Sequence, residues 1–112
     1  MKRFEVLLTA GAEQDIEALY DYVSEFDSVA NADALLDKIL QTADSLATNS
    51  DRGTYPKELL SLGIREYRQL FFKPYRIVYR VVGKQVFIYL IVDGRRDLST
   101  LLAARMMGGA GG

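Results

Sequence analysis

Two arginines on one apolar segment are the first candidates for chemistry. In the segment from Tyr75 to Val81, Arg76 and Arg80 each lie two positions from Val78. Because successive side chains of a strand point to opposite faces, both arginines should share a face. A guanidinium presents a planar fork of donors that matches phosphate or carboxylate. The segment therefore predicts an open, anion-binding face on a sheet whose other face is covered by helices.

Further basic residues could extend this face. They lie on the preceding strand, at the next turn and after the last strand, and are Arg68, Lys73, Arg95 and Arg96. A second interpretation is that these cations pair with acids on neighbouring strands, or are simply the solvated polar residues of their strands. The acids available for such pairing are Glu66, Asp93 and Asp97. We expect Arg65 and Arg105 to be solvated, and the residues alone leave both interpretations of the other cations open.

Composition removes several kinds of catalytic site. The 112 residues include no His and no Cys, so there is no imidazole base and no thiol. No Gly-rich phosphate loop or nucleophile elbow is present, and we predict no cofactor and no metal. The acids Glu13, Asp15 and Glu17 are interpreted as a solvated helix face, and the tyrosines as core or core rim. An enzyme built from this chain would rely on Arg, Lys, Tyr or Glu.

Charge is divided unevenly along the chain. Residues 1–50 carry ten acids and three bases, whereas residues 51–112 carry five acids and eleven bases. Such a division indicates either a surface for an anionic partner or attraction between the two halves within the fold. No apolar run approaches the length of a membrane span. We therefore expect no membrane partner. The absence of Cys and of a signal-peptide pattern at the N-terminus also leads us to expect a cytoplasmic protein.

The first half of the chain predicts a strand and two helices. Phe4 to Leu8 is a short apolar strand candidate. Apolar residues then recur at steps of three and four, first from Ile16 to Phe26 and again from Ala32 to Leu46. Asp27 and Ser28 interrupt the pattern and offer a cap, so the helices should form an antiparallel hairpin.

The second half predicts three strands and a last helix. Residues 47–64 form a connection, and the apolar period then changes to two over residues 65–72, 75–81 and 86–92. Short turns make these strands an antiparallel meander. Asp97 suits the cap of a short C-terminal helix. The predicted fold is α+β in the order β-α-α-β-β-β-α, with the hairpin packed on the antiparallel sheet. One domain over residues 1–107 should precede a flexible Gly-rich tail over residues 108–112.

The order and spacing of these segments together resemble those of the RelE/ParE superfamily, the toxins of type II toxin–antitoxin modules. The most telling segments are Tyr-Arg-Ile-Val-Tyr-Arg-Val at residues 75–81 and Val-Asp-Gly-Arg-Arg-Asp-Leu at residues 92–98. The resemblance covers nearly the whole chain except the tail. It implies a compact cytoplasmic toxin, associated with plasmid stabilisation, that a cognate antitoxin neutralises in a complex of possible higher order. The antitoxin is expected on the outer groove of the hairpin or on an open sheet edge.

The superfamily has two branches with different targets. In the RelE-like branch, ribosome-dependent mRNA endoribonucleases use a catalytic arginine, and Arg76 matches it. Arg80 and Asp93 complete the candidate catalytic set for that alternative. Asp93, however, stands where many relatives carry His, and an arginine stays protonated and is a poor base. The Gly-Arg-Arg-Asp-Leu ending is closer to the ParE-like branch, which is associated with inhibition of DNA gyrase. We therefore expect a gyrase inhibitor that is not an enzyme, with a target-binding set of Arg68, Lys73, Arg76, Arg80, Arg95 and Arg96.

Overall fold

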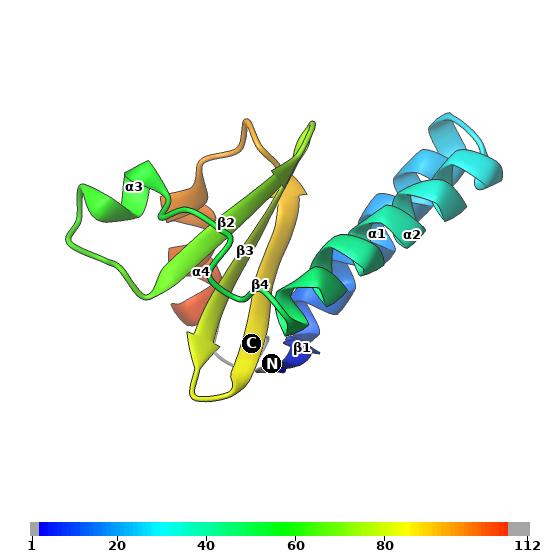
Figure 1. The fold of residues 1–112 in the computed structure, drawn as a ribbon. Helices are drawn as coiled ribbons and strands as arrows, with labels where there is room; N and C mark the ends of the chain where they lie inside the picture. The colour runs from blue at the N-terminus through cyan, green and yellow to red at the C-terminus, as the bar shows by residue number, and fades with distance from the viewer. Residues whose placement is uncertain (1–2, 108–112) are drawn as a thin grey trace.

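The fold consists of a helix hairpin, a four-stranded sheet and two further helices (Figure 1). The computed structural model describes residues 3–107, so the predicted tail at residues 108–112 lies outside the described residues. Along the chain the elements are β1 (Glu5–Leu8), α1 (Ala10–Phe26), α2 (Val29–Asp44), the 3-10 turn η1 (Ser45–Ala47), α3 (Lys57–Leu60), β2 (Tyr67–Phe72), β3 (Tyr75–Val82), β4 (Gln85–Asp93) and α4 (Leu98–Met107).

The sheet has the strand order β1-β4-β3-β2. The predicted meander of β2, β3 and β4 is confirmed, and Gly83 (φ 60°) makes the turn between β3 and β4. The expectation of a wholly antiparallel sheet is wrong for β1, which pairs with β4 in parallel, Val6 opposite Val86. Parallel neighbours need a long crossover, and the helix hairpin with β2 and β3 provides it.

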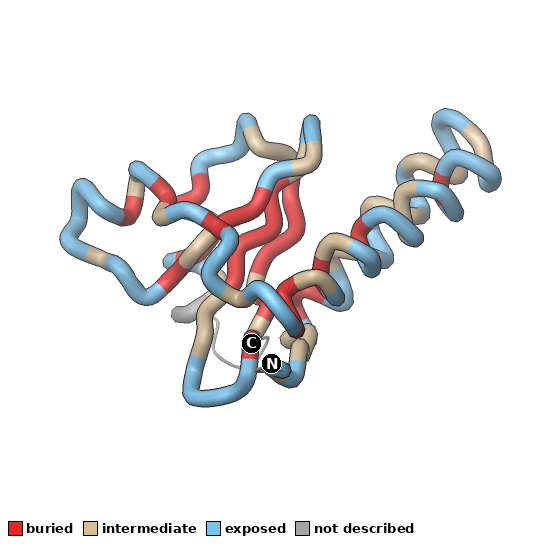
Figure 2. Tube along the Cα trace, in the orientation of Figure 1, coloured by how far each residue is buried: buried red, intermediate tan, exposed pale blue. Residues whose placement is uncertain are grey.

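The helix hairpin begins and turns at side-chain caps. The hydroxyl of Thr9 accepts from the backbone N–H of Ala12 at 3.2 Å, and that of Ser28 accepts from Asn31 at 3.0 Å. This confirms the predicted break at Ser28. Most of the buried hairpin residues lie at the end next to the sheet, whereas the far end, where Ala32 is buried between the helices, extends beyond the sheet (Figures 1 and 2).

One sheet surface, here called the hairpin face, packs against α1 and α2. It carries an apolar cluster centred on Ile77, Tyr79 and Ile88, all 0% exposed. The Tyr79 hydroxyl donates to the Ser50 carbonyl at 2.8 Å and accepts from the Gly53 N–H at 3.0 Å. The predicted alternation of β3 is therefore correct, because Ile77 and Tyr79 do point to the hairpin.

The opposite surface, here called the Arg76 face, is not open as the sequence suggested. Its centre holds Val78 and Leu90 at 0% exposure, packed against Leu98 and Leu102 of α4 and Leu59 of α3. The short helix α3 lies in the segment predicted as a plain connection. Figure 1 shows α3 and α4 on the side of the sheet away from the hairpin. The two helices therefore cover the surface where an exposed row of arginines was expected.

An ion pair ties α1, β4 and α4 together. The Asp15 carboxylate accepts from Arg105 Nη2 at 3.1 Å and from the backbone N–H of Ile91 at 3.0 Å, and Arg105 also donates to the Tyr89 carbonyl. Both side chains are at most one-fifth exposed. The expectation that Asp15 and Arg105 are solvated is therefore wrong: beyond β1, backbone groups of β4 need partners, and these two side chains supply them.

Within residues 3–107, no helix combines the length and apolar character needed to cross a bilayer.

Candidate target-binding site

Arg76 is the most buried of the predicted site residues, at 7% exposure. Its Nη1 donates to Glu58 Oε2 at 2.8 Å, and its Nη2 donates to Oε1 at 3.4 Å. The Phe71 ring lies over the guanidinium, with its centroid 5.4 Å from Cζ. The hydrogen bonds from Arg76 hold the pKa of the Glu58 carboxyl below its usual range. Arg76 is thus an arginine already engaged by a carboxylate of its own chain.

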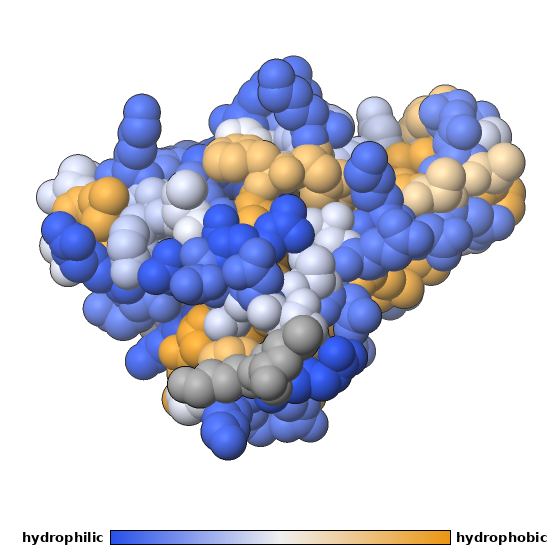
Figure 3. All heavy atoms as spheres, in the orientation of Figure 1, coloured by the Kyte–Doolittle hydropathy of each residue, from blue (hydrophilic) through white to orange (hydrophobic). Residues whose placement is uncertain are grey.

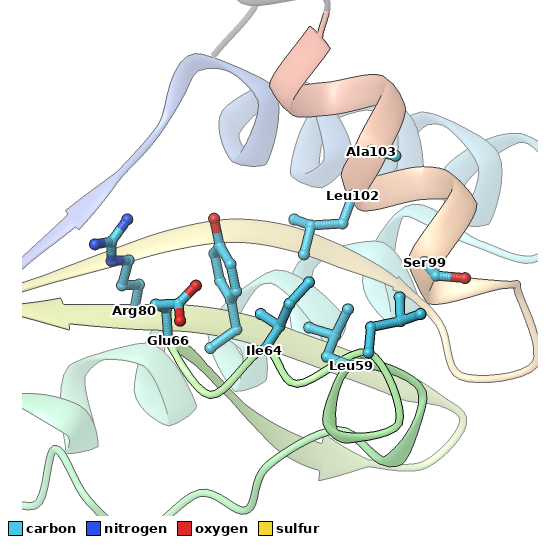
Figure 4. A pocket seen from close by; sticks show the side chains of 9 residues that line it. Leu59, Ile64, Glu66, Arg80, Ser99, Leu102 and Ala103 are labelled. Atoms are coloured by element: carbon cyan, nitrogen blue, oxygen red, sulfur yellow. The ribbon is translucent and has the colours of Figure 1, made fainter.

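Arg80 shares the Arg76 face, as predicted, but lies beside an apolar pocket. This pocket has a volume of about 320 Å³ and is walled by Leu59, Ile64 and Leu102. In Figure 4, Arg80 and Glu66 lie at one end of the pocket and Ser99 at the other. The predicted anion-binding row is therefore interrupted by apolar side chains between α3 and α4.

Arg68 lies on the hairpin face, away from Arg76 and Arg80. It is directly opposite Tyr79 in the β2–β3 register. Its Nη1 donates to the Gly53 carbonyl at 2.9 Å and its Nη2 to the Tyr55 hydroxyl at 3.1 Å. Arg68 therefore holds the connection that runs around the outer edge of β2, and the strand separates it from Arg76.

Three exposed cations gather at one end of the sheet. The N–H of Gly94 donates to the Pro74 carbonyl at 2.7 Å, which joins the β2–β3 turn to the segment after β4. This end carries Lys73, Arg95 and Arg96, all exposed, and we call it the basic end. It lies at the top of the sheet in Figure 1. Of the six predicted target-binding residues, these three form the accessible group.

Asp93 pairs with Arg95 at the basic end. Its carboxylate accepts from Arg95 Nε at 3.0 Å, from Nη2 at 2.9 Å and from the backbone N–H at 2.9 Å. These hydrogen bonds lower the pKa of Asp93 to about 2. A general base works best when its pKa is near the working pH, so Asp93 is poorly matched to proton abstraction at neutral pH. The second sequence interpretation, pairing with nearby acids, therefore applies to Arg95.

Two buried tyrosines are also poor bases. Burial raises the pKa of the phenols of Tyr67 and Tyr79 above the usual value near 10. Both therefore stay protonated at neutral pH. Among residues 3–107 no group of acids is arranged to hold a metal ion.

Sequence reasoning missed Glu58 and Gln69 on the Arg76 face. Glu58 lies within the segment expected to be a connection, and nothing in its spacing marks it. One signal was available: an arginine at the centre of an apolar strand is seldom buried without an acid, so Arg76 required a carboxylate from elsewhere. Only the fold identifies that carboxylate as Glu58.

Together the fold and the basic end define a small α+β protein in which a protruding helix hairpin and a four-stranded sheet support exposed cations. The sequence matches the model of the family described as "ParE toxin of type II toxin-antitoxin system, parDE" over residues 6–98. The chain therefore belongs to the ParE toxin family, which confirms the predicted resemblance and its ParE-like branch.

A solved structure supports the fold. The chain is similar to one from the "Chromosomal ParDE TA system from P. aeruginosa", with a TM-score of 0.69 and 22% sequence identity. The alignment covers 83% of this chain and 98% of that one. A search of curated proteins gave no match.

Proposed function

We propose that this ParE-family toxin inhibits DNA gyrase and does not cleave RNA. The observation that carries the proposal is the state of the two groups that RNA cleavage would require. Arg76, the arginine matched to the RelE-like catalytic position, is buried against Glu58, and Asp93 is held by Arg95 with a pKa of about 2. RNA cleavage needs a group to take the 2′-hydroxyl proton, and neither residue suits that role.

The basic end supplies a surface for the target. Lys73, Arg95 and Arg96 are exposed on adjoining turns, where long side chains can reach a partner without unfolding any element. We assign the target contact chiefly to these three residues. Arg68 and Arg76 contribute to the gyrase contact only indirectly, because they hold the connection at Gly53 and Tyr55 and the helix of Glu58 in place. Charge at such a surface contributes more to the rate and specificity of association than to final affinity.

The proposal is tested by inducing the toxin in cells that carry a DNA-damage reporter, with translation measured in parallel. Gyrase inhibition predicts induction of the reporter before translation falls. A rapid loss of translation, with new cuts in ribosome-bound message and no reporter signal, would replace this proposal with the RelE-like alternative. The Arg76 match is the observation favouring that alternative, and in that case Arg76→Lys would abolish the cuts.

The antitoxin is the second part of the proposal. We assign its docking to the outer end of the hairpin, where Tyr22, Phe26 and Val29 are 62%, 69% and 58% exposed. Figure 3 shows apolar residues along this hairpin. Residues 10–44 also carry nine acids and one base, so a segment with basic and apolar side chains would complement them. Such a segment, disordered when free, would fold on binding.

Antitoxin docking is tested by co-expression with the adjacent reading frame. The double change Tyr22→Ser with Phe26→Ser should keep the toxin active but remove rescue by the antitoxin. Val82→Ser is the matched control, because Val82 is an exposed apolar residue (46%) at the β3–β4 turn. Equal rescue of both variants would place the antitoxin elsewhere.

A further inference from the structure

The Arg76 face contains a second cavity, separate from the apolar pocket beside Arg80. Its volume is about 650 Å³, and six of its seven lining residues carry a polar or charged group. The lining residues are Thr54, Tyr55, Lys57, Glu58, Gln69, Phe71 and Arg76. We call it the Arg76 cavity. It lies where the connection passes around the outer edge of β2, at the Thr54–Gln69 bridge.

Two buried polar atoms in the lining have no partner among the described residues. They are Arg76 Nε and Gln69 Oε1, on side chains whose residues are each 7% exposed. Arg76 has five N–H donors, and only its Nη1 and Nη2 donate, both to Glu58. A buried polar group without a hydrogen bond destabilises a fold. An acceptor on a ligand would supply the partner that Arg76 Nε lacks.

Charge in the cavity favours an added anion. Arg76 and Lys57 contribute two positive charges against the single negative charge of Glu58. Lys57 is exposed and forms no ion pair among residues 3–107. The Gln69 side chain can turn its amide so that the NH₂ group faces an incoming acceptor. A guanidinium edge, an ammonium and an amide would then point donors at one group.

We propose that the Arg76 cavity binds a second carboxylate, from an acidic side chain of a partner protein, beside Glu58. The carboxylate accepts from the free Nε edge of Arg76 and from Gln69, and Lys57 neutralises it. A rotation of the Phe71 side chain exposes Arg76 Nε to the ligand. Phe71 is 56% exposed, so this rotation removes little buried area. Glu58 keeps its place on the other edge of the guanidinium. This inference does not depend on which protein the toxin inhibits.

A polynucleotide fits the cavity less well than one carboxylate. The guanidinium is isolated, because Arg68 lies on the hairpin face and Arg80 borders the apolar pocket. A nucleic-acid strand is bound along a continuous positive track, which these positions do not form. Its backbone would also bring several phosphates close to Glu58. A single acidic side chain adds one negative charge to a cavity that has one excess positive charge.

The binding is measured by NMR on the ¹⁵N-labelled full chain, following the Nε–Hε signal of Arg76. The probe is N-acetyl-glutamate methylamide, and the glutamine analogue, inorganic phosphate and oligouridylate are compared with it. The glutamate probe should shift the Arg76 signal and bind about tenfold more tightly than the glutamine analogue, because a hydrogen bond to a charged acceptor is stronger than one to a neutral acceptor.

Variants separate ligand binding from a purely structural role. Glu58→Gln removes the competing negative charge and should tighten binding of the glutamate probe about tenfold, whereas a loss of structure would weaken it. Lys57→Gln should weaken binding severalfold, and Lys84→Gln, an exposed lysine at the β3–β4 turn, should leave it unchanged. No shift of the Arg76 signal, equal affinity for both analogues, unchanged binding in Glu58→Gln, or preferred binding of phosphate or oligouridylate would each overturn the proposal.

Discussion

The two faces of the sheet differ in what they bury. On the hairpin face the cluster around Ile77 and Ile88 is apolar, and the buried hydroxyl of Tyr79 has both a donor and an acceptor as partners. The Arg76 face has an apolar centre but also buries a guanidinium and an amide, each with an unpaired atom. One face therefore provides stability through complete packing. The other retains unused hydrogen-bonding capacity, which native structures rarely leave in buried groups.

The largest expected loss of stability comes from a substitution on the hairpin face. Ile77→Ala should lower the free energy of unfolding by about 2–5 kcal/mol, because it removes buried methyl groups and leaves a cavity. Urea unfolding measures the change. Val82→Ala, at an exposed position of the same strand, should change it by less than about 0.5 kcal/mol. A loss below about 1 kcal/mol in Ile77→Ala would mean that this face is less tightly packed than the structure indicates.

Loss of the ion pair between Asp15 and Arg105 should have the second largest effect on stability. Asp15→Asn leaves Arg105 without a charged partner and weakens the contact to the Ile91 N–H, so we expect a loss of about 2 kcal/mol. Thermal unfolding gives the size of the effect, and hydrogen exchange should show faster opening of α4. Glu17→Gln, an exposed acid on the same helix, is the control. Equal stability of the two variants would argue that α4 is held by apolar contacts alone.

On the Arg76 face, Glu58→Gln should have a smaller effect that depends on pH. Glu58 is about one-third exposed on its side chain, so the loss at neutral pH should be about 1 kcal/mol. Because Arg76 lowers the folded-state pKa of Glu58, its contribution is complete above the unfolded pKa of about 4.3 and disappears as pH falls through the folded value. Unfolding curves of wild type and variant should therefore converge in acid. A constant difference down to the lowest pH would contradict this coupling.

The smallest expected effect is at the basic end. Asp93→Asn removes an exposed pair with Arg95, whose side chain is 89% exposed, and should leave the unfolding curve unchanged near neutral pH. It should also leave gyrase inhibition intact, since Asp93 has no catalytic role in this account. A variant that folds normally but loses all toxicity would restore Asp93 as a candidate catalytic residue.

The helices and strands could be predicted from the sequence better than the contacts between them. Apolar period and capping residues located the hairpin, the meander and the Asp97 cap, where the Ser99 N–H donates at 3.2 Å. Strand alternation correctly placed Arg76 and Arg80 on one face. It could not show that α3 and α4 cover that face, because α3 has only four residues and no periodic pattern of its own.

The partners of individual charges were the least predictable feature. Asp15 and Arg105 are 90 residues apart, and each looked like a solvated residue of its own helix. Their pairing depends on the bulged β4 strand, whose backbone groups beyond β1 require a donor and an acceptor. By contrast, Asp93 and Arg95 are two residues apart, and local pairing was correctly considered from the sequence.

Gyrase supercoiling with purified toxin tests the central claim most directly. The wild-type chain at micromolar concentration should block supercoiling of relaxed plasmid, and added antitoxin should restore it. Replacing Lys73 and Arg96 with Gln should weaken the block about tenfold, and Arg65→Gln, an exposed arginine before β2, should not. Unaffected supercoiling by the folded wild-type protein, with cleavage of ribosome-bound message by the same preparation, would contradict the account.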